Sequence, residues 1–237
     1  MNHIIRSLII GVAMAAPAMA TAQSQIAPYE LNVKEFTELK VADGINVEYY
    51  CNPQMAGKVM FETIPDFVPL IVFDSNGKGK LEIKLSTREI KYTGLPTVRV
   101  YSSFLSKVEN TGDSTLTVVS VAPVPKLEAR LGGNGRLSVN GIRTTRLESS
   151  ISSGKGTITL TGSATDAKIS LTGTGTIDAT GLKVNDAECK IIGTGWIKCN
   201  VADNLKVTGL GTGGVSFLGN PITRVKALSV KVKRLEE

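Results

Sequence analysis

The sequence predicts an all-β protein, a right-handed parallel β-solenoid with rungs of about 20 residues. Three observations predict this fold. Glycine triplets recur at nearly constant spacing through the second half, apolar and polar residues alternate after each triplet, and equivalent positions carry the same kind of residue in successive repeats. One repeat cannot bury its apolar face alone, so the pattern favours stacked units that share a continuous core.

Gly-x-Gly triplets mark the corners of the predicted rungs. They are spaced 21, 19, 20 and 18 residues apart and begin at Gly133, Gly154, Gly173, Gly193 and Gly211. Glycine adopts backbone conformations that other residues avoid, which suits tight corners. None of the triplets extends to a G-x-G-x-x-G or G-x-x-x-x-G-K-[ST] phosphate loop. The triplets therefore predict corners and not a nucleotide site.

Each repeat contains two strand patterns. After the triplets, apolar residues fill one inward column, formed by Leu137, Ile158, Ile177, Ile197 and Val215. Before the triplets, the inward positions include Ile169, Cys189 and Val207, and the outward position between inward neighbours holds Lys168, Glu188 and Lys206. If the rungs stack in register, these three charges alternate along one face, which supports neighbouring strands modestly. A final strand is predicted over Leu228–Val232, and the charges after it are expected to protect an open end from edge pairing.

The first half is less regular than the second. We predict a signal peptide over 1–22, an irregular β half over 23–125 and the regular solenoid over 126–237, with 30–237 forming one continuous domain. The first half is either the same solenoid with longer corners or a β lobe that caps it. Turns are expected at Asp43-Gly44 and Asn76-Gly77, one helical turn within 64–70, and the seam between the halves at Pro123 and Pro125.

The first 22 residues have the features of a secretory signal. Arg6 precedes an apolar stretch over 7–19 that is too short to span a bilayer, and small residues flank a cleavage position after Ala22. No later apolar run is long enough for a membrane helix. The sequence therefore predicts an exported protein that lacks a transmembrane segment and resides in the periplasm, on the outer surface or outside the cell.

Charge and histidine content limit the chemistry. Residues 23–125 contain ten basic and twelve acidic residues, whereas 126–237 contain sixteen basic and nine acidic ones. The basic half either attracts acidic polysaccharides or lipid headgroups or forms a solvated surface, and export argues against nucleic acid. The only histidine, His3, lies in the predicted signal peptide. The mature chain thus lacks the residue that Ser-His-Asp, Cys-His and most zinc sites require.

The chain resembles a family of exported proteins. The "DGINV" turn at 43–47, the "LPTVRVYSS" stretch at 95–103 and the repeated x-G-x-G-x-I rungs resemble the DUF2807 family, described as a putative auto-transporter adhesin, head GIN domain. Gly44, Ile45 and Asn46 spell the family's GIN letters. The similarity spans about 31–231 and implies a right-handed β-helix, export, an adhesin-like role and a source like the Bacteroidetes in which the family is frequent. It implies no catalytic residue.

Candidate ligand-binding residues are Trp196, Arg136, Arg143 and Arg146. Trp196 follows a glycine corner in an outward column, where an indole ring stacks on a sugar or packs against a neighbouring corner or subunit. The three arginines precede the most regular rungs, where they hold a carboxylate or phosphate or form a solvated face.

Cysteines and carboxylates give weaker signals. Cys189 and Cys199 fall in inward columns, which favours buried free thiols; a disulfide between them is the main alternative, and Cys51 is expected to be unpaired. Asp166, Asp186 and Asp203 are expected near one corner, but their spacing matches no calcium repeat. We therefore predict no metal, no cofactor and no catalytic residue.

The favoured function is a non-enzymatic β-solenoid that adheres to cell-surface glycans or interacts with envelope proteins. The alternatives are a lyase acting on acidic polysaccharides and a purely structural envelope protein that packs against copies or a partner. The sequence leaves the oligomeric state open.

Overall fold

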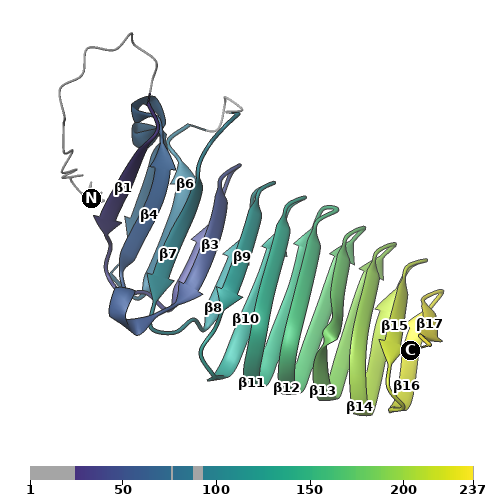
Figure 1. Cartoon of the computed structure of the whole chain (residues 1–237). Coiled ribbons are helices and arrows are strands. Elements are labelled where there is room, and N and C mark those ends of the chain that lie inside the picture. The colour runs from purple at the N-terminus through teal and green to yellow at the C-terminus, as the bar shows by residue number, and fades with distance from the viewer. Residues whose placement is uncertain (1–24, 76, 88–92, 237) are drawn as a thin grey trace, which may run out of the picture.

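The computed structural model describes residues 25–75, 77–87 and 93–236, and 69% of these residues are in β-strands. The strands stack into a β-solenoid of about 6 turns, which confirms the predicted fold class. The N-terminal strands form one end of the stack and the C-terminal strands the other (Figure 1). The predicted signal peptide and Asn76 lie outside the described residues.

The solenoid has two sheets that share one core. The first sheet contains, in spatial order, β5 (Ile71–Ser75), β6 (Lys80–Leu85), β2 (Glu38–Val41), β8 (Lys107–Asn110), β10 (Val124–Gly132), the second halves of β11 (Arg136–Ser153), β12 (Thr157–Gly173), β13 (Thr176–Gly193) and β14 (Trp196–Leu210), and β16 (Ile222–Leu228). The second sheet contains β1 (Ala27–Asn32), β4 (Lys58–Thr63), β7 (Thr97–Ser102), β3 (Asn46–Cys51), β9 (Thr115–Ser120), the first halves of β11–β14, β15 (Gly214–Leu218) and β17 (Lys231–Arg234).

The regular half follows the register that the sequence predicts. Ile158 pairs with Ile177, and Ile177 pairs with Ile197. The column continues without a break across the second sheet through Val98, Val47, Leu116, Leu137, Ile158, Ile177, Ile197 and Val215, all at most 1% exposed. Stacking of like residues thus gives each rung a buried neighbour above and below, and burial of this apolar column stabilises the stack.

The glycine triplets form the corners, and both glycines of a triplet are needed for close stacking. The first glycine takes a positive φ, for example 126° at Gly193. The second glycine sits directly on the corner of the previous rung: a Cβ on Gly175 would lie 2.5 Å from the carbonyl oxygen of Gly156. That same oxygen accepts a hydrogen bond from the amide of Thr176, at 3.0 Å. A side chain at this position would force the rungs apart.

The first half combines both arrangements that the sequence left open. Its rungs join the same stack, but out of chain order: β2 lies between β6 and β8, and β3 lies between β7 and β9. Antiparallel strands then cap this end, with β1 paired to β4, β4 to β7 and β5 to β6. The aromatic rings of Tyr29, Phe61 and Phe73 stack in sequence beneath the cap.

Helical structure is sparse in the described ranges. It consists of the 3-10 helices η1 (Pro53–Met55) and η2 (Pro65–Leu70), the second of which confirms the helical turn predicted within 64–70. No helix there is long and apolar enough to cross a membrane.

The predicted final strand over Leu228–Val232 is wrong. The chain turns at Ser229, which has a φ of 62°, so that β16 ends at Leu228 in the first sheet and β17 begins at Lys231 in the second. The sequence hides this corner for two reasons. No glycine triplet marks it, and Leu228, Val230 and Val232 alternate with polar residues as they would in one continuous strand.

Candidate functional site

The first sheet carries a column of charged residues on its outer surface, here called the charged column. Its members are paired in register from one end of the solenoid to the other: Lys80, Glu38, Lys107, Glu128, Glu148, Lys168, Glu188, Lys206 and Arg224. The alternation predicted for Lys168, Glu188 and Lys206 is therefore confirmed. It is part of a column of nine charged residues whose signs alternate except at Glu128–Glu148 and at Lys206–Arg224.

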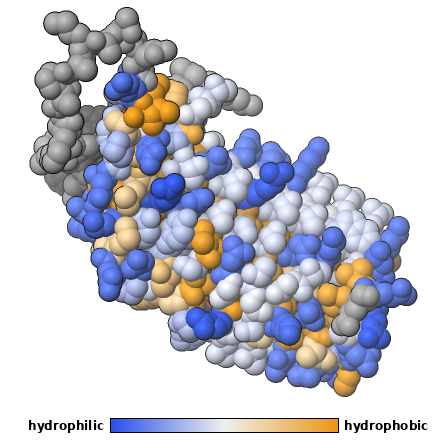
Figure 2. Space-filling model, in the orientation of Figure 1, coloured by the Kyte–Doolittle hydropathy of each residue, from blue (hydrophilic) through white to orange (hydrophobic). Residues whose placement is uncertain are grey.

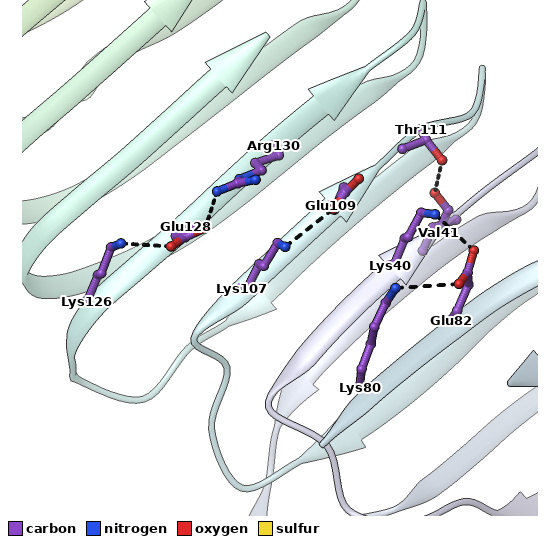
Figure 3. Close-up of polar contacts among 10 residues, drawn as sticks. All are labelled: Lys40, Val41, Lys80, Glu82, Lys107, Glu109, Thr111, Lys126, Glu128 and Arg130. Atoms are coloured by element: carbon purple, nitrogen blue, oxygen red, sulfur yellow. Dashed lines mark hydrogen bonds and ion pairs between the residues drawn. The ribbon is translucent and has the colours of Figure 1, made fainter. Parts of the chain in front are cut away.

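Ion pairs tie this outer surface together. Figure 3 shows them toward the N-terminal end, where Lys40 lies 3.0 Å from Glu82 and Arg130 lies 2.6 Å from Glu128. Lys126 bridges Glu128 at 2.8 Å and Glu148 at 3.1 Å, which relieves the one place where two carboxylates are neighbours in the column. Hydrogen bonding to Lys126 lowers the pKa of Glu128. These pairs are partly exposed, so each contributes little to stability, about 1 kcal/mol or less.

Toward the C-terminal end, the charged column forms one wall of a groove. The groove has a volume of about 500 Å³ and crosses the second halves of β11–β14 and β16. A second row of outward residues, formed in register by Arg146, Asp166, Asp186 and Asn204, forms the other wall. The floor includes the backbone of Ala167 and Ala187, whose side chains are buried in the core behind it.

Hydrogen bonds between groove side chains hold the donors and acceptors of the groove in place. The Lys206 ammonium donates to the Glu188 carboxylate at 2.7 Å, and the Asn204 amide donates to Asp186 at 2.6 Å. The bond from Lys206 lowers the pKa of Glu188, which keeps this carboxylate ionised at neutral pH. No carboxylate of the described chain lies within ion-pair distance of Arg146, Lys168 or Arg224, so these cations are available to an anionic ligand.

Trp196 lies on the second sheet, away from this groove. It occupies the predicted outward column between Thr176 and Gly214. Its half-buried ring packs over Gly214, where any Cβ would collide with the indole, and the Lys233 ammonium lies 5.7 Å from the ring centroid. These contacts match the packing alternative for this residue more closely than an open stacking platform.

The three arginines do not form one cluster. Arg136 pairs with Thr115 and Thr157 on the second sheet, in the same column as Trp196 but three rungs away. Arg143 lies at the bend of β11, beside Ser163. Arg146 alone lines the groove on the first sheet. Neighbours in the sequence separate here because β11 passes from one sheet to the other within ten residues.

The predicted row of corner aspartates is only partly correct. Asp166 and Asp186 pair in register, but the next position in that row is Asn204 and not Asp203. A register shift between Val184 and Asp186 accounts for the difference. Within the described residues, no group of three or more His, Cys, Asp and Glu side chains could hold a metal ion.

Cys51, Cys189 and Cys199 are free thiols in the structure. Cys189 and Cys199 are fully buried, as expected for inward columns. A hydrogen bond with Cys199 and burial raise the pKa of Cys189 well above its usual value. The buried thiols are therefore poor nucleophiles.

Thiol counting separates free cysteines from the alternative Cys189–Cys199 disulfide. In native protein kept without reductant, we expect a thiol reagent to react at most with the half-buried Cys51. After unfolding in denaturant, three thiols should react, because burial no longer protects the other two. A total of one thiol after unfolding would instead establish the disulfide.

The sequence analysis named most of the polar groove residues, but it did not bring them together in one site, and it did not name Asn204 or Arg224. The charged column was visible in three residues. The register of β11–β16 extends it to Arg224 and aligns Asp166, Asp186 and Asn204 as the second wall. Extending the alignment one repeat beyond Lys206 and two residues to either side would have found them.

Known proteins share this architecture. A putative adhesin from Parabacteroides merdae matches 90% of this chain and 97% of its own length, with 22% identity and a TM-score of 0.69. A putative adhesin from Bacteroides fragilis matches 90% and 98%, with 18% identity and a TM-score of 0.79. A putative lipid binding protein from Parabacteroides distasonis matches 89% and 97%, with 17% identity and a TM-score of 0.72. A comparison with curated protein sequences finds no match.

These structural similarities establish the shared fold. The family assignment comes from the sequence: the family model described as "Putative auto-transporter adhesin, head GIN domain" matches residues 35–221, which is most of the chain and includes both the Gly44-Ile45-Asn46 turn and the groove rungs up to β14. The chain therefore belongs to the DUF2807 family.

Proposed function

We propose that this protein is an exported, non-enzymatic adhesion module that binds acidic glycans through the groove on its first sheet. The groove carries the proposal, because it is lined by charged or polar side chains from successive rungs and has cations without carboxylate partners among the described residues. The adhesin description of the family and the signal-like residues 1–22 support a role at the cell surface.

The arrangement of charges suits an acidic polysaccharide. Arg146, Lys168 and Arg224 can bind carboxylate or sulfate groups, and an arginine does so with two parallel hydrogen bonds. Asp166 and Asp186 can accept hydrogen bonds from sugar hydroxyls. Parallel strands repeat every ~4.8 Å along the solenoid axis, so an extended polymer lying in the groove would meet a charged or polar side chain at each rung.

Two features favour binding without turnover. Glu188, the carboxylate in the centre of the groove wall, has a lowered pKa and is a poor general acid near neutral pH. The only histidine of the chain is His3, within the predicted signal peptide. Binding strength spread over many rungs is also what adhesion requires, because repeated weak contacts add up through multivalency.

The test is a binding measurement on a panel of acidic and neutral glycans with the protein from Gln23 onward. We expect selective binding of acidic polymers, weakened about tenfold or more by Lys168→Gln with Arg224→Gln, since each cation contributes a charged hydrogen bond of about 1.5–3 kcal/mol. Lys155→Gln is the matched control: it removes one charge at an exposed corner outside the groove and should leave binding unchanged.

Other results of this binding test would contradict the groove as the binding site or support a different function. Equal binding by the Lys168→Gln/Arg224→Gln variant would contradict the groove, and loss of binding in Trp196→Ala would move the site to the second sheet. Release of unsaturated products from uronate polymers would make the protein a lyase. No binding to any glycan would favour an envelope protein with a protein partner.

A further inference from the structure

The C-terminal end of the solenoid is uncovered within the described chain. Strand β16 pairs only with β14, and β17 only with β15, so each has one edge without a described neighbour. The inward column Ile169, Cys189 and Val207 continues into Val225, but Val225 is 48% exposed because no rung covers it. Ile222 and Leu228, on the outer side of β16, are each 67% exposed.

This end is also strongly basic. Strands β16 and β17 carry five basic residues and no acidic residue: Arg224, Lys226, Lys231, Lys233 and Arg234. Figure 2 shows hydrophobic and hydrophilic residues side by side at this end of the molecule. Positive charges on an edge strand prevent pairing with an identical edge, so two C-terminal ends cannot stack face to face without strong repulsion. They do not oppose pairing with an acidic edge.

The opposite end of the same molecule is such an edge. Strands β1, β4 and β5 with helix η2 carry the exposed carboxylates Glu30, Glu62, Asp66 and Asp74 and a single basic residue, Lys58. Lys58 pairs with Glu30 at 2.6 Å and Lys84 of β6 pairs with Asp74 at 3.5 Å, which leaves an excess of negative charge at this end. Strand β1 pairs only with β4 and β5 only with β6, so among the described residues each has a second edge without a strand partner. The two ends are therefore complementary in charge, and both offer unpaired backbone groups.

We propose that copies of this protein stack head to tail, with the C-terminal end of one copy docked on the N-terminal end of the next. Strand β16 then pairs with β5 of the neighbouring copy. Because β5 runs opposite to β6, whereas all other strands of the first sheet run parallel, this pairing is antiparallel. Strand β17 lies parallel to β1, where Pro28 lacks an amide hydrogen, so the first sheet provides the main contact.

Docking in this way extends features that already hold the rungs together. Arg224 and Lys226 come to lie beside Asp74, as Lys206 lies beside Glu188 within the chain. Val225 gains an apolar neighbour below it. The contact joins two different surfaces, so it does not close on itself and produces open-ended stacks whose length depends on concentration. Attraction between opposite charges also makes the stacking sensitive to salt.

Sedimentation velocity over a range of protein concentrations tests the proposal. We expect the sedimentation coefficient of the wild type to rise with concentration at low salt and to rise less at high salt. Lys226→Glu and Asp74→Lys should each weaken association about tenfold, because each places like charges in the contact. An equimolar mixture of the two variants should associate again, because each variant now complements the other. Lys155→Glu, at a corner midway along the solenoid, should behave as wild type.

Other results would overturn the proposal. A wild type that remains monomeric at every concentration contradicts it, as does an Asp74→Lys variant that associates like wild type. If monomeric wild type instead co-sediments with vesicles containing phosphatidylglycerol, this end docks on an anionic membrane. Circular dichroism and melting temperature confirm that each variant is folded. None of the variants alters a residue of the groove, so failure here leaves glycan binding untouched.

Discussion

Replacing Gly193 with alanine is expected to lower the free energy of unfolding by about 2–4 kcal/mol. Gly193 has a φ of 126°, a conformation that residues with a side chain rarely adopt. A Cβ there would also collide with the carbonyl oxygen of Gly173. That oxygen accepts hydrogen bonds from the amides of Thr194 and Gly195, both at 3.1 Å. The substitution therefore strains one corner and weakens its bonds to the rung before it.

Chemical denaturation followed by circular dichroism measures this effect. Gly44→Ala is the matched control, because no atom of the described chain lies within 4 Å of a Cβ built at that position. Its free energy of unfolding should change by no more than about 0.5 kcal/mol. Equal stability of both variants would mean that the corners do not stack as closely as described.

The second large effect is expected at Ile177, in the middle of the apolar column of the second sheet. Ile177 is fully buried between Ile158 and Ile197. Truncation to alanine removes buried methylene groups and leaves a cavity that neighbouring rungs cannot fill, since each is held in place by its own hydrogen bonds. The expected loss is about 2–5 kcal/mol.

Ile192→Ala is the control for this prediction. Ile192 lies in the same strand but is 42% exposed, so its truncation should cost less than about 1 kcal/mol. The difference between the two midpoints in a denaturant titration is the quantity to compare. Similar midpoints for both variants would contradict the assignment of inward and outward residues along β13.

The regular half could be predicted from the sequence because every constraint there is local. The glycine of each corner, the apolar residue four positions later and the alternation between them recur within about 20 residues. Residues such as Leu137 and Ile158 therefore occupy equivalent positions whatever the rest of the chain does. Stacking in register then follows, because a slip of one residue would expose the whole column.

The first half could not be predicted in the same way. The placement of β2 between β6 and β8 depends on pairings between segments about 40 and 70 residues apart in the chain, such as Leu39 with Leu81 and with Val108. No repeat marks these pairings. The antiparallel cap is equally hidden, since the strand over 27–32 shows the same alternation whether its partner is parallel or antiparallel.

The groove lies between these two cases. Its column of Lys168, Glu188 and Lys206 was predicted from the repeat. The same alignment read two residues earlier gives Asp166, Asp186 and Asn204, although the sequence analysis chose Asp203 as the third member of that row. The arginines were grouped by their proximity in sequence, but the bend in β11 places only Arg146 in the groove. The bend in β11, which the repeat does not mark, therefore decides which of the arginines enters the groove.

Amide hydrogen exchange in the presence and absence of an acidic polysaccharide tests the central claim most directly. If the groove binds the polymer, protection should increase in the second halves of β12–β14, around Asp166, Asp186 and Asn204, and remain unchanged around Trp196 on the second sheet. Increased protection at Trp196 alone, or none at any polymer concentration, would contradict the account.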